Sequence, residues 1–124
     1  MILSIGIDIS DISRFTGATE RHPGILERLF TSGELSDTIK KTDRLSSLSA
    51  RFAAKEAVLK ALKSGWGKGV GWRDVEIVAS EGGAPSVLLH NRADEIFRAM
   101  GGVRLHLSIT HDGGIAAAVA IIES

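Results

Sequence analysis

The chain has 124 residues, a formal net charge of zero, 44% hydrophobic residues and 24% charged residues. This length allows one domain, residues 1–124, and the composition excludes collagen-like, disulfide-rich and wholly disordered chains. Because the chain has no cysteine, it cannot form disulfides, thiol nucleophiles or cysteine-ligated metal sites, and we expect a cytoplasmic protein. No apolar stretch approaches the roughly 18 residues of a membrane span, and no basic leader opens the chain, so we expect no membrane partner.

The hydrophobic pattern predicts the element order β, helices, ββ, α, ββ. In chain order these are a buried strand at 2–9, helices at 12–20 and 23–30, a short helix after Thr31, a long helix at 44–63, strands at 75–79 and 86–90, a helix at 91–100, and strands at 104–111 and 115–122. Ser10 or Asp11 and later Asn91 are expected helix caps, and Thr31 with Glu34 forms a capping-box pattern. This order is typical of an α+β domain whose largely antiparallel sheet packs against one long helix and shorter helices.

Basic residues concentrate in one segment of this otherwise neutral chain. Eight basic and two acidic residues lie between Lys40 and Lys68, so the remainder is net acidic. Such a segment indicates a local anionic ligand more than a nucleic acid, and we expect no nucleic-acid partner. A solvated helix face gives the same pattern, and composition alone does not separate the two.

Two carboxylates far apart in the chain are candidate metal ligands. Asp8 lies in an apolar strand, where it needs a basic residue or a metal, and strand alternation places it opposite Ile7 and Ile9. Glu56 shares one helical face with Lys60 at i,i+4. Ordinary salt bridges or a helix cap would explain each residue alone. If the two carboxylates meet, they suit Mg²⁺ bound together with substrate phosphates better than they suit zinc.

Two further motifs each have a functional and a structural interpretation. The glycines at 65, 67, 69 and 71, accompanied by Lys63 and Lys68, would let backbone N–H groups approach phosphates, or they form a simple connector. His111 ends a predicted strand beside a turn, which fits a site residue or a partly buried structural histidine. A Ser108, His111, Asp112 triad is set aside, because adjacent strand residues point to opposite faces.

Three arginines recur every seven residues near the N-terminus: Arg14, Arg21 and Arg28. On one continuous helix this spacing would form a basic stripe that could hold an acidic helix of a partner protein. Pro23 interrupts the segment, and a solvated face with neighbouring glutamates is the other interpretation.

Taken together, these segments resemble the holo-acyl-carrier-protein synthase family, small 4′-phosphopantetheinyl transferases. The resemblance spans nearly the whole chain and rests on the order and spacing of four segments. These are Gly6-Ile7-Asp8-Ile9, Arg51-Phe52-Ala53-Ala54-Lys55-Glu56-Ala57, Trp72-Arg73-Asp74-Val75-Glu76-Ile77 and Leu107-Ser108-Ile109-Thr110-His111. The chain departs from the family at Gly83-Ala84-Pro85, where Gly-Lys-Pro is common.

The resemblance implies Mg²⁺-dependent transfer of 4′-phosphopantetheine from coenzyme A to a serine hydroxyl of apo-acyl carrier protein, with release of adenosine 3′,5′-bisphosphate. It implies a homotrimer with sites at subunit interfaces. The implied metal ligands are Asp8 and Glu56, and the implied catalytic residues are Glu56, Lys60 and His111. The implied coenzyme A contacts are Arg44, Arg51, Lys60, Gly65, Pro85 and His111. The implied carrier-protein contacts are Arg14 and Arg21. The candidate general base is Glu56 or a metal-bound water that it orients. Other functions compatible with the residues are a non-catalytic module that binds coenzyme A or a carrier protein, and a Mg²⁺-dependent phosphohydrolase.

Overall fold

The structure is a computed structural model that describes residues 1–63, 68–80 and 82–124. Within these residues the strands are β1 (Ile2–Asp11), β2 (Val75–Ala79), β3 (Pro85–Leu89), β4 (Arg104–Asp112) and β5 (Ile115–Glu123). The helices are α1 (Ile12–Arg21), α2 (Ile25–Leu29), α3 (Ser32–Thr38), α4 (Arg44–Leu62), the 3-10 helix η1 (Trp72–Asp74) and α5 (Asn91–Ala99). The strands form a three-stranded antiparallel sheet in the order β1-β5-β4 and an antiparallel pair of β2 and β3. The predicted α+β class is confirmed.

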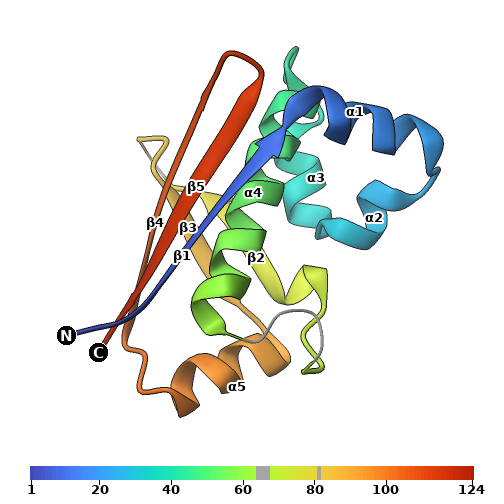
Figure 1. Cartoon of the computed structure of the whole chain (residues 1–124). Helices are drawn as coiled ribbons and strands as arrows, with labels where there is room; N and C mark the ends of the chain where they lie inside the picture. Colours follow the sequence, from blue (N-terminus) through green and yellow to red (C-terminus); the bar gives the residue numbers. More distant parts are fainter. Residues whose placement is uncertain (64–67, 81) are drawn as a thin grey trace.

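The long helix α4 lies along the three-stranded sheet, with α1, α2 and α3 gathered at one end and α5 at the other (Figure 1). The two chain termini lie side by side, and the Ser124 N–H donates to the Met1 carbonyl at 2.9 Å. Across the described residues, none of the helices combines the length and apolar character needed to cross a membrane.

Small side chains allow α4 to approach the sheet closely. Alanines 53, 57 and 61 of α4 and alanines 116, 118 and 120 of β5 are all buried. At Gly6 of β1 the contact is tightest, because a Cβ atom there would lie 1.9 Å from the Ala57 carbonyl oxygen. Any side chain at residue 6 would therefore push α4 away from the strand, so this glycine sets the distance between the two elements that carry Asp8 and Glu56.

The prediction that β1 is buried was wrong for one of its two faces. Gly6 and Ser10 face α4 and are buried, whereas Ile5, Ile7 and Ile9 face outward with exposed fractions of 58%, 64% and 65%. The expected alternation is correct, but the apolar residues occupy the outer face, because only small residues fit beneath α4. The chain thus leaves an apolar row on the outer face of the sheet.

Two of the three helix caps predicted from the sequence are present. Asp11 caps α1 by accepting a backbone N–H, and Thr31 and Glu34 form both bonds of a capping box at α3. The cap predicted at Asn91 was wrong. The N-cap of α5 is His90, which makes no side-chain capping bond, and Asn91 has a positive φ of 51°.

Candidate active site

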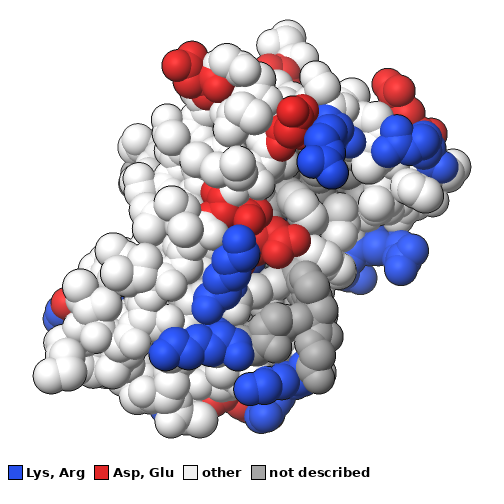
Figure 2. Space-filling model, viewed as in Figure 1, with Lys and Arg blue, Asp and Glu red and all other residues white. Residues whose placement is uncertain are grey.

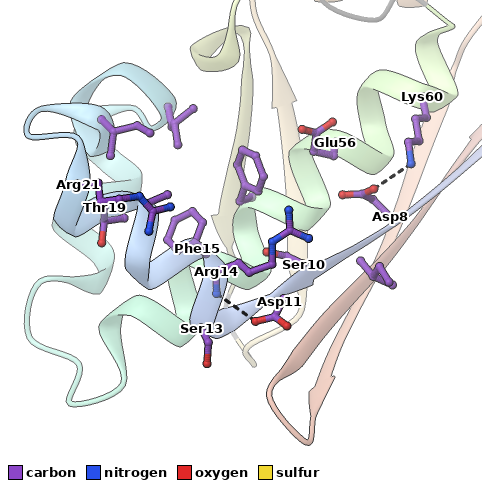
Figure 3. A pocket seen from close by; sticks show the side chains of 15 residues that line it. Asp8, Ser10, Asp11, Ser13, Arg14, Phe15, Thr19, Arg21, Glu56 and Lys60 are labelled. Atoms are coloured by element: carbon purple, nitrogen blue, oxygen red, sulfur yellow. Dashed lines mark hydrogen bonds and ion pairs between the residues drawn. The ribbon is translucent and has the colours of Figure 1, made fainter.

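A pocket of about 840 Å³ lies between β1, α1, α2 and α4. Its charged lining brings together five residues predicted from the sequence: Asp8, Arg14, Arg21, Glu56 and Lys60. The close view shows Asp8 and Glu56 on neighbouring walls, with Arg14 and Arg21 on α1 along the opposite side (Figure 3). On the face where β1 crosses α4, acidic side chains occupy the centre and basic side chains border them (Figure 2). The site is therefore a recess in which opposite charges meet.

Lys60 on α4 is paired with Asp8 on β1. Its ammonium donates to Asp8 Oδ1 at 2.8 Å and to the Ile7 carbonyl at 3.1 Å. The hydrogen bond to Asp8 raises the pKa of Lys60, so this residue stays cationic. The Lys60 side chain is 55% exposed and the Asp8 side chain 19% exposed, so the ammonium end remains open to a ligand entering the pocket.

Glu56 carries a half-buried negative charge that lacks compensation. The i,i+4 pair with Lys60 that the spacing allows is not formed, because Lys60 turns to Asp8. Among the described residues, no hydrogen-bond donor is directed at the Glu56 carboxylate. Burial, followed by the neighbouring charge of Asp8, raises the pKa of Glu56, and Lys60 offsets this rise only in part. A cation placed between the two carboxylates would remove the repulsion between them.

The donor set fits a hard divalent cation. Asp8 and Glu56 offer carboxylate oxygens only, and no group of three or more acidic or histidine side chains in the described part of the chain could hold a metal by itself. Mg²⁺ is commonly bound by one or two carboxylates, with water and substrate phosphates completing its shell. Asp8 and Glu56 are thus the residues that could hold such an ion.

A second pocket, of about 290 Å³, holds three other predicted residues: Arg51, Pro85 and His111. Arg51 is only 7% exposed, and its guanidinium donates to the Ile77 carbonyl at 3.1 Å and lies 3.7 Å from a carboxylate oxygen of Asp37. His111 lies on the core-facing side of β4 at its exposed end, beside the turn to β5. This arrangement presents two basic side chains and a rigid proline to one small recess.

Helix α4 separates the two pockets. Phe52, Glu56 and Lys60 line the larger one, whereas Ser47 and Arg51 line the smaller one. At about 100° per residue, Glu56 points roughly 140° away from Arg51 around the helix axis. The chain does not bring Glu56 and His111 into one pocket, although the sequence places both in a single site.

One predicted contact lines neither pocket, a second falls outside the described residues, and one lining residue was not predicted. Arg44 is not among the residues lining the smaller pocket, and its Nε donates to Thr38 Oγ1 at 3.5 Å. Gly65 lies outside the described residues. Lys41 lines the smaller pocket without belonging to any motif. Its only signal in the sequence was its place in the basic segment that begins at Lys40.

The model of the 4′-phosphopantetheinyl transferase superfamily matches residues 4–119 of this chain. The chain belongs to that superfamily. Relatives of this transferase include the holo-acyl-carrier-protein synthase of Moorella thermoacetica, 46% identical over 123 residues that cover 99% of this chain and 95% of the relative. The holo-acyl-carrier-protein synthase of Renibacterium salmoninarum is 46% identical over 124 residues and covers 100% of both chains.

Solved structures of the superfamily share the fold of this transferase. The holo-acyl-carrier-protein synthase of Neisseria meningitidis matches with a TM-score of 0.90 and 27% identity, covering 100% of both chains. The Helicobacter pylori enzyme in complex with coenzyme A matches with a TM-score of 0.83 and 35% identity, covering 96% of this chain and 99% of that one.

Proposed function

We propose that this transferase moves 4′-phosphopantetheine from coenzyme A to a serine hydroxyl of apo-acyl carrier protein. The serine oxygen attacks the phosphorus that bears the pantetheine arm, the bond from that phosphorus to the bridging oxygen breaks, and adenosine 3′,5′-bisphosphate leaves. The observation that carries the proposal is that Asp8, Glu56 and Lys60 line one pocket, in which Lys60 pairs with Asp8 and no donor among the described residues reaches Glu56. Relatives that cover the whole chain and are named holo-acyl-carrier-protein synthase support it.

In this proposal Asp8 and Glu56 hold Mg²⁺, which would stabilise negative charge on the phosphate oxygens. Lys60 faces the same pocket with an exposed ammonium and neutralises further charge as the leaving group departs. The proposed acceptor of the serine proton is Glu56 itself or a metal-bound water that it orients.

The smaller pocket is the proposed position of the adenine nucleotide of coenzyme A. Arg51 and His111 offer donors to its phosphates, and Pro85 forms a rigid wall. Arg44 and Gly65 remain part of this proposal through the resemblance alone. The carrier protein is placed at α1, where Arg14 and Arg21 border the larger pocket and can meet an acidic partner surface.

We propose a homotrimer whose active sites each use two subunits. The isoleucine row on β1 aligns with Ala117, Val119 and Ile121 of β5, which continues an apolar surface across the outer sheet face. Such a surface is typical of contact with another copy of the chain. Shared sites would also let the larger pocket of one subunit meet the smaller pocket of another, which α4 prevents within one chain.

The reaction is tested by incubating the protein with coenzyme A, Mg²⁺ and apo-acyl carrier protein and then measuring the mass of the carrier protein by mass spectrometry. A gain of one phosphopantetheine is expected. Binding of coenzyme A without a gain would indicate a non-catalytic module, and hydrolysis without an acceptor would indicate a phosphohydrolase; either result contradicts the proposal.

Shared sites are tested by complementation between inactive variants. Chains carrying Glu56→Gln keep the smaller pocket intact, and chains carrying His111→Ala keep the larger one intact. When the two are mixed and allowed to exchange subunits, activity should return, because some interfaces combine two intact halves. No recovery from chains that do exchange, or sedimentation of the active parent chain as a monomer, would contradict the shared site.

A further inference from the structure

A buried lysine lies directly before Glu56 on α4. Lys55 has no exposed surface, and its ammonium lies 2.7 Å from Glu34 Oε1 and 5.4 Å from the centre of the Phe30 ring. The same ammonium donates to the carbonyls of Trp72, at 3.0 Å, and of Val75. Each of its three protons therefore has a fixed acceptor outside α4.

Glu34 completes this buried cluster from the other side. It has no exposed surface and accepts backbone N–H bonds from Thr31 at 2.9 Å and from Ile77 at 3.0 Å. The pair of Lys55 and Glu34 thus ties α4 to α3, η1 and β2. Because a buried ion pair contributes little net stability compared with well-packed apolar residues, stability alone does not explain its presence.

These bonds constrain α4 in addition to its apolar packing. The alanine contacts and Gly6 set its distance from β1, and Ser49 and Arg51 provide two further polar ties, to Ser10 and to the Ile77 carbonyl. The bonds of Lys55 to three partners on other elements oppose rotation of α4 about its axis. Glu56 is the next residue, so any rotation changes its position relative to Asp8.

We propose that Lys55 is a positioning residue: together with Glu34 it sets the rotation of α4 that holds Glu56 in the same pocket as Asp8. This inference rests on the proposed function of that carboxylate pair. The Glu56 carboxylate lies about 6 Å from the helix axis, so a rotation of about 10° displaces it by about 1 Å. A displacement of that size at a reacting centre can reduce the rate about 100-fold.

The decisive variant removes both charges while keeping the volume nearly constant: Lys55→Met with Glu34→Gln. The glutamine oxygen can still accept one backbone N–H, and no unpaired charge stays buried. We expect this double variant to fold, with kcat reduced about 100-fold and KM for coenzyme A within about threefold of the parent chain, because Arg51 keeps its bond to the Ile77 carbonyl.

Metal binding gives a readout that needs no turnover. Binding of Mn²⁺ in the presence of coenzyme A, without carrier protein, is followed by water-proton relaxation, and we expect about tenfold weaker binding in the double variant. The matched control is Arg98→Met with Asp94→Asn, which removes the exposed 2.9 Å pair on α5 and should change neither readout. Circular dichroism and the melting temperature report whether each variant is folded.

A folded double variant with parental kcat and parental Mn²⁺ binding would overturn the positioning role. If the double variant does not fold, Glu34→Asp decides the question, because it keeps both charges and withdraws the carboxylate by one methylene. We expect a folded protein with kcat reduced about tenfold, whereas unchanged kcat overturns the role. The parent chain is assayed in parallel: absence of transfer there would refute the proposed reaction, and the Mn²⁺ readout would still judge the positioning role.

Discussion

The two sides of α4 differ in how completely their charged side chains are paired. On the side that packs against α3 and β2, Lys55 is fully buried and all three of its protons are bonded. On the side that faces β1, the adjacent Glu56 is half-buried, receives no hydrogen bond from the described residues, and has a raised pKa because of burial and the charge of Asp8. Lys55 thus has every partner that its charge needs, whereas Glu56 is left short of one, as is typical of a site residue. The contrast fits the proposals above, in which Lys55 fixes α4 and Glu56 carries the chemistry.

The largest effect on transfer is expected when Asp8 or Glu56, at the side of α4 that faces β1, is neutralised. Glu56→Gln or Asp8→Asn removes a proposed metal ligand, so transfer should fall by about 10³-fold or more. The melting temperature should not fall, because neither change leaves an unpaired buried charge. Carrier mass gain and thermal unfolding measure the two effects separately. The matched control Asp94→Asn on α5 should keep full activity, and comparable activity in Glu56→Gln would place the metal elsewhere.

Neutralising Lys55 alone, on the side of α4 that packs against α3 and β2, should in addition destabilise the fold. Lys55→Met leaves Glu34 as an uncompensated buried charge, and the free energy of unfolding should fall by about 3 kcal/mol. The same substitution one helical turn away, Lys60→Met, removes an exposed ammonium and should cost less than about 1 kcal/mol of stability while reducing transfer strongly. Urea denaturation of both variants tests the contrast, and equal losses of stability would remove the distinction between the two sides.

A smaller effect is expected at the rim of the larger pocket. Arg14→Ala or Arg21→Ala should raise KM for the carrier protein about five- to tenfold and weaken the dependence of that KM on salt, with little change in kcat. Arg28 belongs to the same seven-residue repeat but lies on α2 and does not line the pocket, so Arg28→Ala is the matched control. If all three variants behave alike, binding reflects overall charge and not this rim.

Much of the fold followed from local signals. Helical periodicity located α4 within one residue, and the Thr31 and Glu34 capping box is present. The orientation of β1 did not follow, because its apolar residues suggested burial while the outcome depended on Gly6 and the distance to α4. The cap at Asn91 failed because a favourable residue type does not fix which residue holds the capping geometry.

The candidate site, like the fold, was predicted from the sequence only in part. The resemblance placed Asp8, Glu56 and Lys60 together, and the structure brings them to one pocket. The separation of Glu56 from His111 depends on where α4 lies across the sheet, which spacing along the chain cannot reveal. Lys55 looked like one more member of a basic segment, since nothing in its neighbouring alanines predicts that Glu34 lies within 2.7 Å.

The smallest expected effect concerns stability in the absence of metal, and its direction follows from the raised pKa of Glu56. A carboxyl with a raised pKa in the folded chain binds its proton more tightly there than in the unfolded chain, so ionising it costs stability. That cost is absent below the ordinary glutamate pKa of about 4.3, grows as pH rises above it, and is complete above the higher folded value. Glu56→Gln avoids the cost.

In EDTA at pH 7 to 8, Glu56→Gln should therefore be more stable than the parent chain, and the difference should vanish near pH 4. Urea denaturation across this pH range measures it. Mg²⁺ together with coenzyme A should then stabilise the parent chain and not the variant, since binding to the folded state alone adds stability. A variant that is less stable than the parent at neutral pH without metal would mean that Glu56 already has a partner, and the contrast with Lys55 would no longer hold.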